Sequence, residues 1–160
     1  MGGFGALQLS MRHPDLFAAG VSHAGVDAIL YGGPFPYVKG KVKVATQEDL
    51  TKYATGSSEV DNIGRWMKTV MGSDISVWRS YDPVALAQKV EAGKPALYID
   101  CGTEDVFALY NGAQYLHDVL TERNIDHAFY LGPGGHDFKF VKTRLPESLK
   151  FLRDHTAKPQ

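Results

Sequence analysis

The chain has little cysteine, no long apolar run and almost no net charge. Cys101 is the only cysteine among 160 residues, which excludes an internal disulfide framework and a cysteine-rich zinc site. The 17 Lys and Arg nearly balance the 18 Asp and Glu, so the clustered positive charge that binds nucleic acid or an acidic membrane surface is missing. No apolar run approaches the roughly 20 residues of a membrane-spanning helix.

The N-terminus also lacks a signal-peptide pattern. Residues Met1 to Gly5 contain no basic region followed by an apolar stretch, so we expect a cytoplasmic location. A hydrophobic content of 44% with 22% charged residues is typical of an ordinary globular protein. At this length we expect one domain, covering residues 1–160.

The periodicity of apolar residues predicts helices that alternate with short buried strands. Helical spacing or helix signals mark four segments, and compact apolar runs of strand length mark three. The expected helices cover residues 2–13, 83–90, 109–123 and 140–155, and the expected strands cover 17–22, 95–101 and 127–131. Asp82 is the expected N-cap of the second helix, with Pro83 in its first turn. Such alternation predicts a parallel sheet with right-handed crossovers, and hence an α/β fold.

Residues 27–80 do not follow this alternation. The segment is rich in glycine, proline and aromatic residues, with only short periodic pieces, and predicts an excursion of loops and short helices. Its aromatic side chains are expected either to line an apolar pocket or to pack in the core. They are Tyr31, Phe35, Tyr37, Trp66 and Trp78.

Two residues with catalytic chemistry follow neighbouring predicted strands. Asp105 comes after the strand at 95–101, and His136 comes after the strand at 127–131, each in a glycine-containing turn. Functional groups in an open parallel sheet collect beyond the carboxyl ends of its strands. An acid followed by a histidine matches the last two members of the Ser, Asp, His order, in which the acid holds the imidazole in the correct tautomer.

A nucleophile for this pair belongs on a sharp strand-to-helix turn of the form G-x-S-x-G. The chain begins with a glycine-rich helix start, and Gly2 would be the second glycine of that motif if a serine preceded Met1. Three glycines in the first five residues weaken a helix by roughly 1 kcal/mol each, so we expect a close approach to the backbone there.

These motifs resemble the α/β-hydrolases of the esterase group that includes tributyrin esterase, esterase D (S-formylglutathione hydrolase) and the feruloyl esterases. The resemblance covers nearly the whole chain, from the elbow helix to the histidine motif. The matching stretches are 1–7, 12–17, 22–25, 71–78, 82–86, 100–105 and 134–138. It implies the C-terminal part of an α/β-hydrolase fold, with parallel strands flanked by helices and the excursion at about 27–80.

The resemblance also implies a carboxylic-ester hydrolase with an acyl-enzyme mechanism and no cofactor or metal. Short-chain or aromatic acyl esters are the expected small-molecule substrates. Asp105 would orient His136, which would act as general base and then general acid. The backbone N–H of Met1 would form one arm of the oxyanion hole. The nucleophilic serine is expected immediately before Met1 and is absent from these 160 residues.

Several alternatives remain open at this stage. Ser22, at the end of a strand, is a possible substitute nucleophile, and Glu104 competes with Asp105 as the acid. Cys101 is expected to be a buried core residue. The chain is either part of a larger hydrolase or a short relative. The alternative to the esterase is a non-catalytic fragment or pseudo-enzyme that self-associates through an exposed sheet edge. We therefore expect a homo-oligomer or pairing with a missing N-terminal half, because an open strand edge templates pairing.

Overall fold

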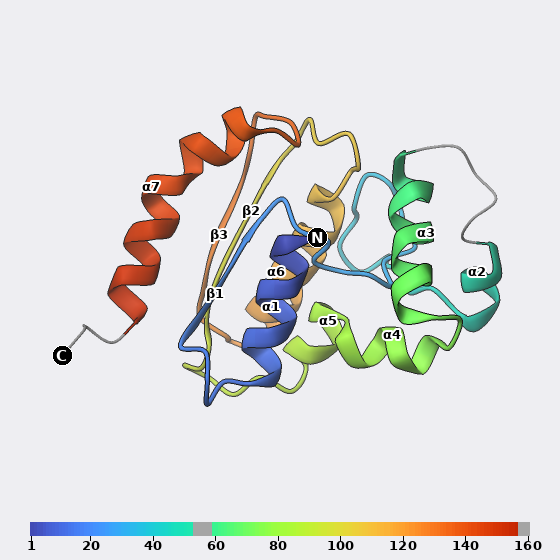
Figure 1. Ribbon diagram of the computed structural model, residues 1–160, viewed down its shortest axis with the longest axis horizontal. Helices are drawn as coiled ribbons and strands as arrows, with labels where there is room; N and C mark the ends of the chain where they lie inside the picture. Colours follow the sequence, from blue (N-terminus) through green and yellow to red (C-terminus); the bar gives the residue numbers. More distant parts are fainter. Residues whose placement is uncertain (53–58, 157–160) are drawn as a thin grey trace.

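The computed structural model describes residues 1–52 and 59–156, and residues 53–58 of the predicted excursion lie outside the described residues. It contains three parallel strands flanked by helices (Figure 1). The elements along the chain are α1 (Gly2–Arg12), β1 (Ala19–His23), α2 (Gln47–Lys52), α3 (Glu59–Met71), α4 (Ile75–Tyr81), α5 (Pro83–Ala87), β2 (Ala96–Gly102), α6 (Tyr110–Glu122), β3 (His127–Gly132) and α7 (Phe138–His155).

The sheet has the order β1-β2-β3, so consecutive strands are neighbours and β2 is central. Ser22 of β1 pairs with Ile99 of β2, and Ile99 pairs in turn with Phe129 of β3. Helix α7 covers one face of the sheet, while α1 and α6 cover the other, and α5 packs against α1 and α6 (Figure 1). This arrangement brings the turns that follow β2 and β3 to the same edge.

Two apolar clusters hold the layers together. The larger lies between the sheet and the helices α1, α5 and α6, and includes Leu7, Leu97, Ile99, Leu116 and Leu120. The smaller belongs mainly to the excursion between β1 and α5, and consists of Val26, Ile29, Leu30, Ala45, Leu50, Met67 and Trp78. Burial of such side chains contributes about 1.5 to 3 kcal/mol each.

The predicted alternation of helices and strands is confirmed, with shifts at element ends. Strand β1 begins at Ala19 rather than Phe17, because the amides of Leu16 and Phe17 both donate to the carbonyl of His13 in the turn after α1. Asp82 caps α5 by accepting a hydrogen bond from the amide of Val84, as expected. The excursion contains one helix, α3, that is longer than predicted, at 13 residues.

Gly3 confirms the close approach expected at the glycine-rich start of α1. A Cβ atom on Gly3 would lie 2.9 Å from Cα of Gly25 and would overlap the hydroxyl of Ser22. Gly2 and Gly5 have no neighbouring atom within 4 Å of a Cβ position. The requirement for glycine is therefore specific to Gly3, where α1 lies against the end of β1.

Candidate active site

The turns after β2 and β3 are joined to each other by backbone hydrogen bonds. The amide of Thr103 donates to the carbonyl of Gly132 at 2.8 Å, and the amide of Glu104 donates to the carbonyl of Gly134 at 2.9 Å. Gly102 allows this contact, because a Cβ there would lie 2.5 Å from the carbonyl carbon of Gly134. The two turns thus form one connected platform at the carboxyl ends of the strands.

Asp105 and His136 meet on this platform. Nδ1 of His136 lies 2.7 Å from Oδ2 of Asp105, and the amide of Phe107 donates to Oδ1 of Asp105 at 2.8 Å. The Asp105 side chain is fully buried, whereas 35% of the His136 side chain is exposed. Because Nδ1 is held by the acid, Nε2 is the ring nitrogen left for proton transfer.

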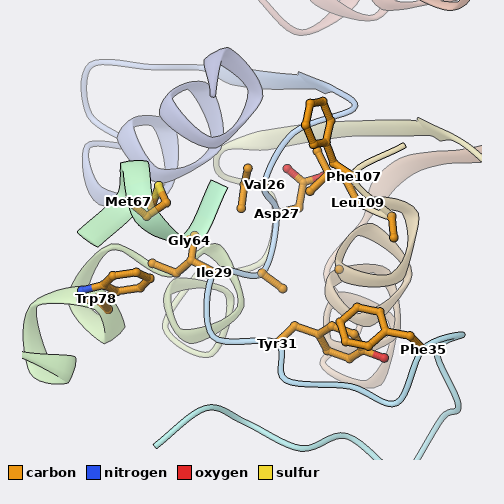
Figure 2. Close-up of a pocket in the computed structure, with 13 residues that line it drawn as sticks. Val26, Asp27, Ile29, Tyr31, Phe35, Gly64, Met67, Trp78, Phe107 and Leu109 are labelled. Carbon is orange, nitrogen blue, oxygen red and sulfur yellow. The ribbon is translucent and has the colours of Figure 1, made fainter. Parts of the chain in front are cut away.

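An apolar pocket lies beside His136. The Phe107 ring packs edge-on against the His136 ring, with centroids 4.9 Å apart at 87°, and Phe107 also lines the pocket. Three of the aromatic residues expected to line a pocket, Tyr31, Phe35 and Trp78, do so (Figure 2). Trp78 is also a core residue, so both expectations hold for it. Trp66 is 58% exposed and does not contribute to the lining.

Asp27 is a site residue that the sequence analysis missed. It lies in the segment after β1, is 1% exposed and lines the pocket. Its Oδ1 accepts a hydrogen bond from the hydroxyl of Ser22 at 2.7 Å. The signal in the sequence was a single acid within the apolar stretch 24–30, where a carboxyl group needs a buried partner or a function.

Burial raises the pKa of Asp27 to about 7. The hydrogen bond from Ser22 lowers this pKa, and the charge of Asp100 raises it. Asp82 is a second buried carboxyl group whose pKa is raised to about 7 by its burial. Such groups take up protons on folding, because an unfolded aspartate ionises near its ordinary value of 3.8.

These raised pKa values predict that the free energy of unfolding falls as the pH rises. Between about pH 4 and 7 the folded state binds more protons than the unfolded state, so each carboxyl group costs stability at up to about 1.4 kcal/mol per pH unit. Asp27→Asn removes one titration and flattens this slope in urea unfolding measured across the window. The exposed Asp126→Asn is the matched control and leaves the slope unchanged. An unaltered slope in Asp27→Asn would contradict the assignment.

The other candidate residues are placed as follows. Ser22 is fully buried, and its hydroxyl is engaged with Asp27. Glu104 is exposed, whereas its competitor Asp105 contacts His136. Met1 is the N-cap residue of α1 and is 49% exposed.

Cys101 is a fully buried core residue, as expected. Burial and the charges of Asp105, Asp27 and Asp100 all raise the pKa of its thiol. The thiol therefore stays protonated and has little nucleophilic character.

A second histidine and acid pair lies on the same sheet but has a different environment. Nδ1 of His23 is 2.9 Å from both carboxylate oxygens of Asp100, and Nε2 is 3.0 Å from the hydroxyl of Ser148 in α7. Ser148 is 1% exposed and also donates to the carbonyl of Leu145. This group connects α7 to the ends of β1 and β2, and its serine is buried.

No metal or membrane element accompanies the site in the described residues. Across 1–52 and 59–156, no three His, Cys, Asp or Glu side chains gather as metal ligands. None of the helices within these ranges has both the length and the apolar character of a membrane span.

A parallel sheet with an acid and a histidine in the turns after adjacent strands belongs to the α/β-hydrolase class. Within this class, the sequence matches the family described as Putative esterase over residues 1–152. The chain belongs to that family. None of the curated proteins matches the chain.

Solved structures with the same fold include two S-formylglutathione hydrolases. The enzyme from Staphylococcus aureus superposes with a TM-score of 0.58 at 19% identity, over 95% of this chain and 51% of that one. The enzyme from Agrobacterium tumefaciens gives 0.63 at 19% identity, over 97% of this chain and 46% of that one. A ferulic acid esterase gives 0.54 at 23% identity, over 98% and 50%. The chain thus spans about half the length of these structures.

Proposed function

We propose that the chain is the acid- and histidine-bearing part of a serine carboxylesterase, with its nucleophile on a segment preceding Met1. The observation that supports this most is the 2.7 Å contact between Nδ1 of His136 and Asp105, next to an apolar pocket. We call the chain together with that N-terminal segment the assembled protein. Its substrates are esters with short-chain or aromatic acyl groups, since the pocket lining is largely apolar.

The proposed reaction uses His136 as a proton carrier. Nε2 takes the proton of the serine hydroxyl while the serine oxygen attacks the ester carbonyl carbon, and Asp105 stabilises the imidazolium. The tetrahedral intermediate expels the alcohol, which takes the proton from Nε2, and leaves an acyl-enzyme. A water molecule repeats the sequence and releases the acid. The backbone N–H of Met1 follows the serine directly and donates to the oxyanion.

The sequence encoded upstream of Met1, together with the intact mass, tests this proposal. A Gly-x-Ser sequence directly before Met1 is expected, and a fluorophosphonate should label that serine covalently in the assembled protein. The 160-residue chain by itself should hydrolyse p-nitrophenyl acetate no faster than the background. A natural start at Met1 with turnover in the isolated chain would overturn the proposal.

Asp105→Asn is expected to lower kcat of the assembled protein strongly without abolishing it. The amide cannot stabilise the imidazolium and favours the wrong tautomer of His136, which costs up to about 10⁴-fold. Some hydrolysis remains because Asp105 orients the base and does not itself transfer the proton. Steady-state kinetics with p-nitrophenyl acetate measure the loss, with Asp126→Asn as the exposed control. Equal rates in both variants would exclude Asp105 as the triad acid.

The open edge of β1 supports a second proposal, that the isolated chain associates with itself or with a separate N-terminal piece. Strand β1 pairs only with β2 in the three-stranded sheet of the described residues. The other edge of β1 therefore presents unpaired N–H and C=O groups that favour pairing with another strand.

Analytical ultracentrifugation at micromolar concentration is expected to give a species larger than a monomer. The carbonyl of Ala18 and the amide of Ala24 bond to β2, so alternation turns the amide of Val21 to the open edge. Val21→Pro removes that donor and should weaken association, because proline is tolerated only at such edges. A cooperative monomer with the original sequence would contradict the proposal.

A further inference from the structure

The pocket beside His136 combines an apolar lining with a single carboxyl group. It has a volume of about 610 Å³ including its open mouth. Figure 2 shows Asp27 between Val26 and Phe107, with Met67 and Trp78 along one side and Tyr31 and Phe35 along another. Since Phe107 also packs on His136, a group held near Asp27 lies close to the proposed reaction centre.

The two oxygens of Asp27 have different surroundings. Oδ1 accepts the hydrogen bond from Ser22, at 2.7 Å. Oδ2 is buried and has no hydrogen-bond partner among the residues that the structure describes. A buried polar atom without a partner loses its hydration and gains no hydrogen bond in return, so an orphaned oxygen calls for an explanation.

A purely structural role explains only half of this carboxyl group. The contact with Ser22 at the end of β1 needs one acceptor oxygen, which an asparagine would also supply. The second oxygen contributes nothing to that contact and carries the desolvation cost. A ligand that enters the pocket with a hydrogen-bond donor would satisfy Oδ2 and remove this cost.

We propose that Asp27 is a specificity-determining residue, whose Oδ2 accepts a hydrogen bond from an O–H or N–H donor on the apolar part of the ester. This inference rests on the proposed esterase function and narrows its substrate class. Substrates of this class carry a compact apolar group, which the aromatic lining accommodates, together with a hydroxyl or protonated amine. Unsubstituted acyl esters of the same size are poorer substrates because they leave Oδ2 unpaired.

The electrostatics of Asp27 agree with this assignment. Burial raises its pKa to about 7, because the interactions in the unliganded pocket do not fully compensate the ionised carboxylate for its lost hydration. A donor from a ligand, above all a charged one, stabilises the ionised form and strengthens the hydrogen bond. The same carboxyl group would weaken the binding of groups that present only acceptors, because two acceptors repel each other.

Ligand binding to the natural full-length protein, including any segment before Met1, tests the inference without any hydrolysis. The probes are benzylammonium, benzyl alcohol and ethylbenzene, which share an aromatic ring and differ in a charged donor, a neutral donor and no donor. Dissociation constants come from NMR titration of this labelled protein at about pH 8, above the pKa of Asp27. The measured quantity is the affinity of each donor probe relative to ethylbenzene.

Asp27→Asn is expected to reduce this relative affinity about tenfold, because the amide places an N–H donor where Oδ2 accepted. Asp27→Ala removes both oxygens and should give a similar loss, which covers the case of a rotated asparagine amide. Asp126→Asn is the control, since Asp126 is an exposed aspartate that lies outside this pocket. A larger loss for benzylammonium than for benzyl alcohol would identify the preferred donor as charged.

An unchanged relative affinity in both Asp27 variants would overturn the inference, as would an absence of chemical-shift changes at the pocket residues with every probe. The first result would indicate that Oδ2 has a partner outside the 160 residues. Neither result depends on His136 or on a serine nucleophile. Failure of the esterase proposal would instead appear as a missing upstream serine, with donor selectivity in the pocket intact.

Discussion

His136→Ala abolishes the hydrolysis of p-nitrophenyl acetate by the assembled protein, with an expected loss of about 10⁴-fold or more in kcat. The reason is that Nε2 of His136 is the only base that the proposed mechanism uses, both to activate the serine and to protonate the leaving alcohol. Asp105 cannot replace it, because its side chain is fully buried behind the imidazole. The loss should therefore exceed that of Asp105→Asn.

The control for this experiment is His155→Ala. His155 is exposed at the end of α7 and its ring contacts Phe151 of the same helix, so its removal leaves hydrolysis unchanged. Covalent labelling of the serine by a fluorophosphonate should slow in His136→Ala in parallel with hydrolysis. Full turnover in His136→Ala would show that the pairing with Asp105 is structural and would require another base.

The pairing of Asp105 with His136 was predictable because it depends on local signals. Each residue follows an apolar run of strand length, and parallel strands bring such turns to one edge of the sheet. Neither the strand ends nor the helix ends need to be known accurately for this conclusion. Even the shift of β1 by two residues left the order of strands and the position of both turns unchanged.

The burial of Asp27 was not predictable, since it depends on residues that are distant in the sequence. Its carboxyl group lies in a pocket whose lining also includes Met67 of α3 and Phe107 of the turn after β2. The sequence places an acid after a strand and a glycine, which is usual for a turn. The same limit applies to His23, whose partners Asp100 and Ser148 lie 77 and 125 residues away.

The close packing of the turns after β2 and β3 requires glycine at Gly102. The chain passes so close to itself at Gly102 that a Cβ would lie 2.5 Å from the carbonyl carbon of Gly134 and 3.2 Å from the amide nitrogen of Gly135. These are backbone atoms, so the clash cannot be relieved by rotating a side chain. The hydrogen bond from Glu104 to Gly134, at 2.9 Å, holds the same segment in place.

Gly102→Ala is therefore expected to destabilise the chain by about 1 to 3 kcal/mol, the usual cost of overpacking. It should also push the segment that contains His136 away from Asp105, and a displacement of about 1 Å lowers the rate by about 100-fold. Urea unfolding measures the first effect, and hydrolysis by the assembled protein measures the second.

Gly5→Ala is the matched control for Gly102→Ala. A Cβ on Gly5 meets no atom within 4 Å, and alanine favours the interior of α1 by up to about 1 kcal/mol. The two substitutions add the same methyl group and should change stability in opposite directions. If Gly102→Ala unfolded at the same urea concentration as the original chain and kept full activity, the two turns would not be packed as described. The position of His136 would then be set by α7 alone, through the capping of that helix by Asp137.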